Sequence, residues 1–505
     1  MGYYEQETPP AREERLIVGD SFAGKGCDAL DCAKSGCMLR KGRRFWQANA
    51  CQMMLSLMMA VTVENSVIIL HSPIGCGSML HSLEIASARG KSRRGKAATG
   101  AIWLSTNLQE SDVINGGEKK LKDTILYADR EFHPEIIFVV STCVPNIIGD
   151  DVEDVVKEVG EGTQAQVTAI HCPGFKSRVV ASAYDSFYHS IISHIQLDPI
   201  PYKDYQPVER FDPDYGIKIR RFNAQKQMTV NIFNATSIGP DDEAELARLL
   251  HAIGLNVRVY AEYSSAQELR LISHAGLNVS MCNVHDDYIL KYLEEEFNIP
   301  YIICGMPIGF SGVRTWLLEI AEHYEIADKA KSLIDSEEKQ LREALKPLLP
   351  QIQGKRVMID GGVVRSLSEA IMMKELGVEV IGVNAYHYDD GTDPVLRQFS
   401  QEWSDVPFAV SNQIYEAINQ VKKLKPDLVI SHAGTHGWLA KAGVPSMHLF
   451  DVEKPFFGYA GIYRFVRKMQ FALKNTSYVD RLAKHTQLPY KEEWYDKDPF
   501  YYITD

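Results

Sequence analysis

The nine cysteines are the side chains of this sequence with the clearest capacity for chemistry. They lie at positions 27, 32, 37, 51, 76, 143, 172, 282 and 304. No two of them form a CxxC pair, which gives little support for a zinc ribbon or a thioredoxin-like redox site. Nine cysteines in 505 residues are also too sparse for a disulfide scaffold. What remains is free thiols, a catalytic thiol, or widely spaced ligands that the fold brings together.

Three of these cysteines have surroundings that suit an inorganic ligand. Cys76 lies on a glycine-flanked turn, HSPIGCG at 71–77, directly after an apolar run; Cys143 ends another apolar run, and Cys51 precedes a methionine-rich stretch. Small neighbours let a bulky group approach the backbone, and thiolates are the usual ligands of iron–sulfur clusters. The alternative is that all three are buried structural cysteines, since free cysteine is among the most buried residue types.

Cys282 and His448 form a second candidate pair. Cys282 precedes the segment 283–297, whose apolar residues recur with the helical period. We expect the thiol near the N-terminus of that helix, where the helix dipole favours the thiolate. His448 lies between GVPSM and a PFFG segment at 455–458. A lone histidine beside apolar residues is more often a hydrogen-bonded core residue, so the residues alone leave both readings open.

A third group, Cys27, Cys32 and Cys37, lies in a charged N-terminal segment that we expect to be irregular. It could hold or shield a metal, but flexible free thiols are the favoured interpretation.

The elements that must position these side chains repeat along the chain. An apolar run rich in β-branched residues is followed by a helical stretch and then by another such run, with copies that begin at about 135, 228 and 356. Strands that alternate with helices of 10–15 residues indicate parallel sheets. We therefore predict an α/β fold with three Rossmann-like domains around a central metal-cofactor cavity. Ligands of such sheets lie beyond the carboxyl ends of the strands.

The predicted domains have boundaries near 225 and 350. The division is an N-terminal extension (1–45), a domain with Cys51, Cys76 and Cys143 (46–225), a domain with Cys282 (226–350), and a domain with His448 plus a C-terminal helical segment (351–505). No GxxxxGK[ST] sequence occurs, and no convincing GxGxxG follows a strand. Nothing in the sequence therefore predicts a nucleotide-binding loop.

Composition excludes several classes of protein. The 54 Lys and Arg against 66 Asp and Glu give a formal charge of −12, which argues against a nucleic-acid partner. No run of about 18 uncharged apolar residues occurs, and the first residues lack the pattern of a signal peptide. We therefore expect a cytoplasmic protein.

Taken together, the motifs resemble the nitrogenase component 1 family, in particular its D-type (alpha) subunit, from about Cys51 to about Leu473. HSPIGCG at 71–77 is similar to the family's HGPxGC motif, and STCVPNIIGDD at 141–151 is similar to its STCxxxxIGDD motif. The resemblance implies that Cys51, Cys76 and Cys143 are this subunit's share of the electron-relaying P-cluster. That cluster lies between two subunits, so a K-type (beta) partner and a heterotetramer are implied.

The same resemblance assigns the second pair. Cys282 with the following Tyr288-Ile289 is similar to the motif whose cysteine ligates one end of the active-site cofactor, and His448 to the motif whose histidine ligates the other. Cofactor-assembly scaffolds of the family keep the cysteine but generally lack the histidine, so the pair implies a catalytic subunit with a large iron–sulfur cofactor. An ATP-dependent [4Fe-4S] reductase is the implied electron donor. The sequence does not indicate whether the cofactor contains molybdenum, vanadium or only iron.

The chain departs from the dinitrogen-reducing members at the residues beside the cofactor. Val180 and Tyr184 stand where those members carry a glutamine and a histidine. Loss of the imidazole should impair dinitrogen reduction, which needs protons delivered to a developing anion.

Two basic residues of the family are also missing. The first is expected after Cys76, in the region that residues 81–84 occupy here. The second, which holds the organic acid of the molybdenum cofactor, is expected before His448, where this chain reads HAGTH at 432–436. Both dinitrogen as substrate and homocitrate as a component are therefore disfavoured.

The similar subfamily that remains is the nitrogenase-like methylthio-alkane reductases, whose D subunit the chain resembles. The implied reaction is reductive cleavage of the C–S bond of dimethyl sulfide or 2-(methylthio)ethanol, with release of methanethiol and a hydrocarbon. The alternatives are a dinitrogen-reducing alpha subunit, a non-catalytic scaffold for cofactor assembly, and a ligand-free α/β protein.

Overall fold

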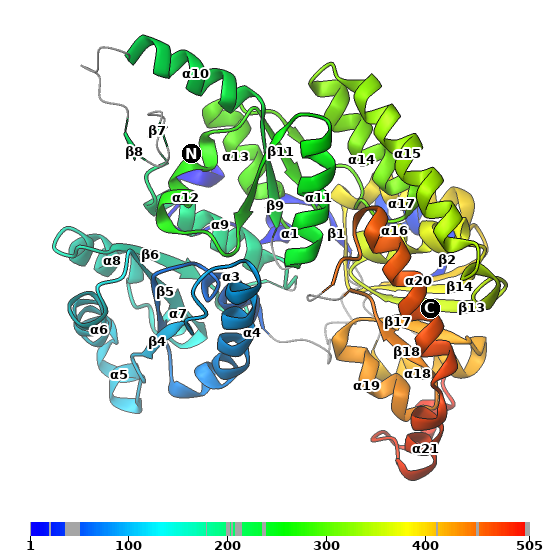
Figure 1. Ribbon diagram of the computed structural model, residues 1–505. Helices are drawn as coiled ribbons and strands as arrows, with labels where there is room; N and C mark the ends of the chain where they lie inside the picture. Colours follow the sequence, from blue (N-terminus) through cyan, green and yellow to red (C-terminus); the bar gives the residue numbers. More distant parts are fainter. Residues whose placement is uncertain are drawn as a thin grey trace.

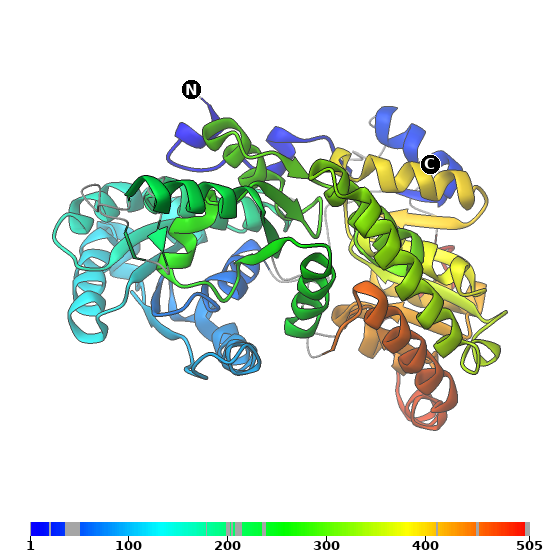
Figure 2. The ribbon, with the colours of Figure 1, turned by 45° about the horizontal axis from the view of Figure 1, so that its top comes forward.

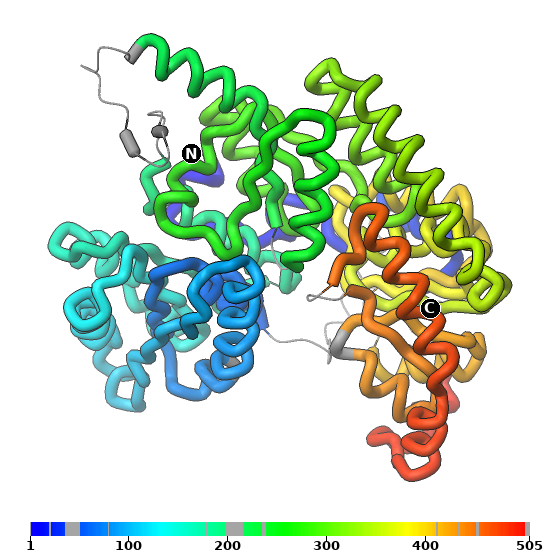
Figure 3. The backbone as a smooth tube through the Cα atoms, viewed as in Figure 1, coloured from blue at the N-terminus to red at the C-terminus, as the bar shows by residue number. Residues whose placement is uncertain are grey.

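The computed structural model describes residues 2–19, 22–35, 51–177, 179–197, 202–203, 206–207, 215–234, 239–410, 413–450 and 454–499. In these residues the chain forms an α/β structure with three sheets of mainly parallel strands, which we number first, second and third in chain order (Figure 1). The tube in Figure 3 follows the chain from the first sheet (blue to cyan) through the second (green) to the third (yellow to red). The predicted fold class, α/β with parallel sheets flanked by helices, is therefore confirmed.

The first sheet has four parallel strands in the order β4-β3-β5-β6. They are β3 (Ser66–His71), β4 (Ile102–Ser105), β5 (Ile136–Ser141) and β6 (Gln166–His171). Successive residues of a strand face opposite sides of the sheet, so Ile68 and Leu70 join one apolar cluster and Val67 and Ile69 another. The covering helices are α3 (Gln52–Ala60) and α9 (Ser182–His194) on one side and α6 (Glu118–Phe132) and α8 (Val152–Gly160) on the other.

The second sheet is also parallel, in the order β10-β9-β11-β12. Its strands are β9 (Thr229–Asn234), β10 (Asn256–Ala261), β11 (Leu277–Ser280) and β12 (Tyr301–Ile302). The helices that connect or follow them are α11 (Pro240–Ala252), α12 (Ala266–Arg270), α13 (Asp287–Phe297), α14 (Gly309–His323) and α15 (Ala327–Leu345).

The third sheet has six strands in the order β18-β17-β13-β14-β16-β2, of which only β2 is antiparallel to its neighbour. They are β2 (Phe22–Lys25), β13 (Arg356–Gly361), β14 (Glu379–Ala385), β16 (Pro407–Val410), β17 (Leu428–Ser431) and β18 (Ser446–His448). Helices of this part of the chain are α16 (Val363–Glu375), α17 (Asp393–Glu402), α18 (Ile414–Leu424), α19 (Ala433–Lys441) and α20 (Gly458–Lys474). The last of these packs against α11, α14 and α15 and so joins the second and third sheets.

Shorter elements complete the described chain. Those before the second sheet are η1 (Tyr3–Glu5), α1 (Arg12–Arg15), β1 (Val18–Gly19), α2 (Gly26–Ser35), η2 (Ile74–Met79), α4 (Leu80–Arg93), α5 (Glu110–Asn115), α7 (Cys143–Ile148), β7 (Tyr202–Lys203), β8 (Gln206–Pro207) and α10 (Tyr215–Gln227). Those after it are η3 (Leu271–Ser273), η4 (Leu349–Gln351), β15 (Tyr388–Asp389), η5 (Asp390–Thr392), α21 (Ser477–His485) and α22 (Glu492–Tyr495).

The three predicted strand–helix repeats are present, but two local predictions are wrong. The N-terminal segment is not irregular, because β2 extends the third sheet and α2 packs against α17. The helix expected from 283 begins instead at Asp287, so the residues directly after Cys282 form a loop. The domain boundaries and the central cavity stay predictions. No helix in the described part of the chain is both long and apolar enough to cross a membrane.

Candidate functional site

Cys51, Cys76 and Cys143, which we call the three-cysteine site, lie at the carboxyl edge of the first sheet. Cys76 is in η2, which follows β3, and Cys143 is the first residue of α7, which follows β5; Cys51 caps the start of α3. None of the three forms a disulfide, Cys51 is exposed, and the other two are half-buried. The alternative of three buried structural cysteines is therefore wrong.

Gly174 shows how closely these thiols converge. Its N–H donates a hydrogen bond to Cys143 Sγ at 3.1 Å. A Cβ at this position would lie 3.1 Å from Cys51 Cβ and 3.6 Å from Cys143 Sγ, so only glycine leaves the space between the two cysteines open. Burial raises the pKa of the Cys76 thiol, and the nearby Cys51 and Cys143 add to the increase. Three convergent thiols around an open backbone position fit an iron–sulfur cluster.

The surface beside the three-cysteine site is apolar. Ile74, Ile147 and Phe175 are 56%, 70% and 60% exposed, and each is within four positions of Cys76, Cys143 or Gly174 along the chain. We call these three side chains the apolar rim. Large exposed apolar side chains beside a site are candidates for contact with another protein.

Cys282 lies in a loop at the carboxyl end of β11. Its N–H donates to Ser280 Oγ at 3.0 Å, and that hydroxyl donates to Asp286 Oδ2 at 2.7 Å. Tyr188 donates its hydroxyl to the other oxygen of Asp286 at 2.8 Å. Burial raises the pKa of Cys282 to about 12, although the backbone N–H of Val284 opposes the increase. The expected effect of the helix dipole is therefore wrong, since the helix begins five residues away and burial dominates.

His448 ends β18 and lies among other imidazoles. Its exposed ring stacks on the ring of His436, with centroids 4.3 Å apart and planes at 18°. His432 precedes α19 and packs against the rings of Phe450 and Tyr386, at centroid distances of 5.6 Å and 5.3 Å. The start of α19 thus places the ring of His436 against His448 and the ring of His432 within electrostatic range of it.

Arg365 is a buried cation within electrostatic range of both parts of the second pair. This arginine of α16 is in range of Cys282 and of His432, and His432 is in range of His448. Its guanidinium lies 5.1 Å and 4.9 Å from the ring centroids of Phe450 and Phe457. We call the surroundings of Cys282, Arg365 and His448 the second site.

Sequence reasoning missed Arg365. The signal that could have found it is the Gly361-Gly362 pair at the end of β13, four and three residues before the arginine, because the carboxyl end of a parallel strand is where ligands bind.

Several buried polar atoms of the second site have no protein partner. Among the described residues, both carboxylate oxygens of Glu369, the hydroxyls of Ser366 and Ser431, and His432 Nδ1 are buried and have no hydrogen-bond partner. Burial raises the pKa of Glu369 well above its ordinary value, against the opposing effect of Arg365. Most buried polar atoms in folded proteins have a partner. These residues therefore fit a bound polar or inorganic group that supplies the missing contacts.

Val180 and Tyr184, the positions expected to differ from dinitrogen-reducing members, lie in or beside α9. Tyr184 is buried, and its ring stacks on His285 of the Cys282 loop with centroids 4.1 Å apart and planes at 30°. Val180 is half-buried, and His81 is exposed. An imidazole is thus present near Cys282, although it comes from the loop after β11 rather than from α9.

The N-terminal cysteines differ from the expectation of flexible thiols. Cys27 and Cys32 both lie in α2; Cys27 is exposed and free, whereas Cys32 is disulfide-bonded, so free thiols are wrong for Cys32. Cys37 lies outside the described residues. Within the described chain, no three His, Cys, Asp or Glu side chains form a group suited to a single metal ion.

Comparison with known proteins gives matches over most of the chain. The sequence profile of a family described as "Nitrogenase component 1 type Oxidoreductase" matches residues 51–474. The nitrogenase molybdenum-iron protein alpha chain of Methanothermobacter marburgensis is 26% identical over 454 residues, which cover 87% of this chain and 89% of that protein. The nitrogenase iron-molybdenum cofactor biosynthesis protein NifE of Methanococcus maripaludis is 26% identical over 420 residues, with coverages of 81% and 80%.

A solved structure gives the same fold. "Nitrogenase Cp1 at pH 5" superimposes with a TM-score of 0.70 and 21% sequence identity, and covers 90% of this chain and 92% of that chain. At that identity the similarity shows the arrangement of sheets and helices alone.

Proposed function

The chain belongs to the nitrogenase component 1 type oxidoreductases, and from that premise we propose that it is the catalytic subunit of a nitrogenase-like reductase that cleaves C–S bonds. The proposed substrates are small methylthio-alkanes such as dimethyl sulfide and 2-(methylthio)ethanol. For dimethyl sulfide, two electrons and two protons convert the substrate to methanethiol and methane.

The proposal of a catalytic role is supported by one observation above all: buried Arg365, in electrostatic range of Cys282, shares the ring of Phe450 with His432, which is in range of His448. In the proposed arrangement the Cys282 thiol and the His448 imidazole would hold the two ends of a large iron–sulfur cofactor. When bound, such a cofactor supplies stored low-potential electrons. Arg365 would offset its negative charge, and the unpartnered atoms of Glu369, Ser366 and Ser431 would lie beside it.

The proposed substrate follows from Val180 and Tyr184, of which Tyr184 stacks on His285 of the Cys282 loop. Tyr184 and Val180 offer an aromatic ring and an aliphatic group where dinitrogen-reducing relatives are expected to carry a histidine and a glutamine. An uncharged organic sulfide needs apolar contacts rather than hydrogen-bond donors for binding. His285, stacked on Tyr184, is the candidate proton source on this side.

The three-cysteine site completes the proposed electron path. Cys51, Cys76 and Cys143 would hold a P-cluster-type iron–sulfur cluster, whose remaining ligands come from a K-type (beta) partner that covers the apolar rim. Two such pairs would form the heterotetramer. The ATP-dependent [4Fe-4S] reductase would dock transiently, which is consistent with the absence of a nucleotide-binding loop motif from this sequence.

The test is a substrate comparison on the anaerobically purified complex with its reductase and ATP. We expect methanethiol from dimethyl sulfide and from 2-(methylthio)ethanol, measured by gas chromatography, and no ammonia from dinitrogen. Ammonia formation without methanethiol would show a dinitrogen reductase instead. Anomalous X-ray diffraction at the iron, molybdenum and vanadium edges would identify the metals at both sites.

A cofactor-assembly scaffold is the second candidate. Its support is the match to proteins named as cofactor biosynthesis proteins, which are as similar to this chain as the alpha chains are. The exposed ring of His448 also suits a cofactor that can leave. This candidate predicts transfer of cluster iron from the chain to an apo-enzyme, and no methanethiol with reductase, ATP and sulfide.

A further inference from the structure

The N-terminal residues 4–19, which we call the N-terminal strap, lie across parts of the chain that belong to different sheets. Tyr4 packs edge-on against Tyr288 and Tyr292 of α13, at centroid distances of 5.0 Å and 5.1 Å. At its other end, β1 pairs antiparallel with β15, which follows the third sheet's β14. Figure 2 shows this segment, in dark blue, running along the top of the molecule from the side of the first and second sheets to the third.

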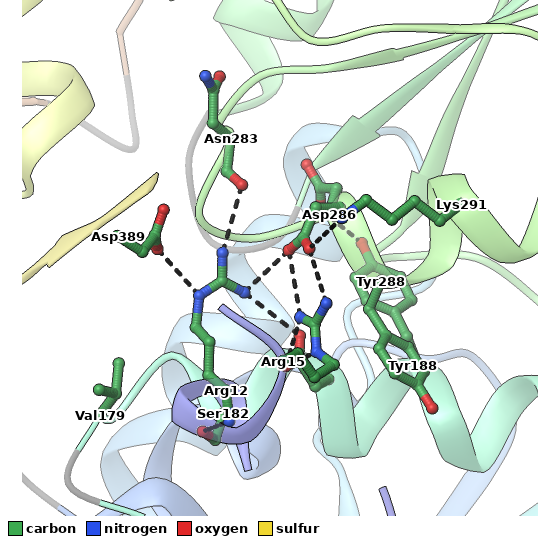
Figure 4. Close-up of polar contacts among 12 residues, drawn as sticks. Arg12, Arg15, Val179, Ser182, Tyr188, Asn283, Asp286, Tyr288, Lys291 and Asp389 are labelled. Carbon is green, nitrogen blue, oxygen red and sulfur yellow. Dashed lines mark hydrogen bonds and ion pairs between the residues drawn. The ribbon is translucent and has the colours of Figure 1, made fainter. Parts of the chain in front are cut away.

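Arg12 is the central residue of the strap and is fully buried, with 0% of its surface exposed. Its Nε donates to Asp389 Oδ2 of β15 at 2.9 Å, and its Nη1 donates to Asp287 Oδ1 of α13 at 2.9 Å and to Asp185 Oδ1 of α9 at 3.4 Å (Figure 4). The three carboxylates are themselves buried, and each comes from the part of the chain that carries a different sheet. One guanidinium therefore joins all three.

Arg15 has a narrower set of contacts. It pairs with Asp185 at 2.7 Å and with Asp287 at 2.9 Å but not with Asp389, so among the three carboxylates it joins only those of α9 and α13. Lys291 lies 3.7 Å from Asp287 and brings the cluster to three cationic and three anionic side chains. Buried charges of this kind persist only when they are paired and hydrogen-bonded.

The loop that carries Cys282 lies directly against this cluster. Arg12 Nη2 donates to the carbonyl oxygen of Asn283 at 3.4 Å, and Asn283 Nδ2 donates to the carbonyl of Gly391 at 2.8 Å. On its other side the loop is held by the hydrogen bonds that join Ser280, Asp286 and Tyr188. Residues 281–286, which we call the 282 loop, are therefore fixed from two directions, and the strap supplies one of them.

We infer that Arg12 is a positioning residue for Cys282, because its guanidinium holds the 282 loop at a fixed place relative to the first and third sheets. The planar guanidinium can donate in three directions at once, whereas a lysine ammonium at the end of a flexible chain cannot reproduce that fork. The inference rests on the proposed function only for what Cys282 binds; the restraint on the loop is independent of it.

The test compares four variants of the full chain. Arg12→Lys keeps the charge but loses the fork, and Asp389→Asn removes the anion of the third sheet with little change of shape. Arg15→Lys is the control within the cluster, and Asp405→Asn is the control for an exposed pair, since Asp405 and Lys25 are both largely in water. Each is measured by hydrogen exchange of the amides of 281–290, and by iron content and EPR spectrum after anaerobic assembly.

We expect Arg12→Lys and Asp389→Asn to speed exchange in the 282 loop about tenfold while the strands of the first sheet exchange as before. The EPR signal of the active-site cofactor should change shape in both variants and keep its shape in Asp405→Asn, with Arg15→Lys intermediate. Unchanged exchange in the 282 loop, or a change spread evenly over the chain, would overturn the inference. Absence of cofactor iron from the unaltered chain would instead contradict the proposed function and leave the exchange result intact.

Discussion

The two candidate metal sites of this chain differ in how much of their surroundings the chain itself provides. The three-cysteine site lies at the edge of the first sheet, with Cys51 exposed and the apolar rim beside it. The second site combines buried charged groups, Arg365 and Glu369, with the exposed ring of His448, and its loop is held by the N-terminal strap. The first site thus offers an exposed surface to the proposed partner, whereas the buried groups of the second lack contacts that a ligand can supply.

The two sites therefore lack different things: the three-cysteine site lacks a cover for its exposed apolar side chains, and the second site lacks hydrogen-bond partners for its buried polar atoms. An exposed apolar surface loses its unfavourable contact with water when another protein covers it. A buried carboxylate without a partner is costly until a hydrogen-bond donor or a cation arrives. We therefore expect changes at the three-cysteine site to affect assembly of subunits, and changes at the second site to affect what is bound within the chain.

The largest expected effect comes from Cys143→Ala, which removes a proposed cluster ligand. Because loss of even an outer-shell partner weakens metal binding 10- to 100-fold, loss of the ligand should lower electron-dependent product formation by at least about 100-fold. Iron per chain should fall as well, as measured by elemental analysis. Cys172→Ala is the matched control, since Cys172 is buried against Ser56 Oγ at 2.8 Å and is no proposed ligand. Equal losses in both variants would contradict the assignment of Cys143.

A smaller effect is expected from Phe175→Asp in the apolar rim. A buried aromatic residue at the centre of an interface commonly contributes 2 kcal/mol or more, so the dissociation constant of the partner subunit should rise about 30-fold. Surface-based binding measurements or analytical ultracentrifugation would give this value. Tyr478→Asp serves as the control, because Tyr478 is 67% exposed on α21, far along the chain from the three-cysteine site. Should both variants weaken association alike, the rim would not be the interface.

Gly174→Ala changes the space between the cysteines of the three-cysteine site and should speed the loss of iron about tenfold. The added Cβ would lie 3.1 Å from Cys51 Cβ, so Cys51 must shift by a few tenths of an ångström. The measurement is the rate of iron loss to a chelator in the assembled complex. Gly160→Ala is the control, since no atom lies within 4 Å of a Cβ at that position. Identical rates of iron loss for the two variants would argue against convergence of the cysteines on Gly174.

Much of the fold was predictable because local sequence carries it. The apolar, β-branched runs of β5, β9 and β13 are each followed by a helix, and a parallel sheet is the common solution for such alternation. Four of the five proposed ligands, all but Cys51, lie at or just after strand ends, but the residues alone left their roles open and the resemblance to the family assigned them. The weakest local signal was β2, a four-residue strand at a sheet edge whose sequence FAGK does not alternate clearly.

The missed residues depend on contacts that no local pattern encodes. Arg12 and Asp389 are 377 positions apart, and nothing near either residue in the sequence indicates the other. Arg365 and Glu369 read as ordinary charged positions of a helix, yet both are buried, because α16 is enclosed by the third sheet and the helices around it. For the second site, the sequence therefore indicated the proposed ligands Cys282 and His448 but not the buried charges of Arg365 and Glu369.

The last comparison is between two buried glutamates, one in each region, and the smallest effect of all is expected at Glu369. Glu153 of α8 accepts hydrogen bonds from His171 Nε2 at 2.8 Å and His194 Nε2 at 3.1 Å. Burial raises its pKa, but the two histidines outweigh burial and lower it to about 2. A lowered carboxyl pKa contributes stability that is present above the unfolded pKa of about 4 and is lost as pH falls toward 2. Glu369 has the opposite shift, with its pKa raised by burial.

Glu153→Gln should therefore lower the free energy of local opening of α8 by about 2 kcal/mol at pH 7, with a deficit that shrinks below pH 4. Glu369→Gln should leave the opening of α16 unchanged within about 0.5 kcal/mol, because no stabilising hydrogen bond is lost when an unpartnered carboxylate is neutralised. Native-state hydrogen exchange of the two helices at pH 7, 5 and 3.5 measures both. A large loss for Glu369→Gln in the ligand-free chain would mean that the carboxylate is already satisfied by the fold, and the contrast between the two regions would then disappear.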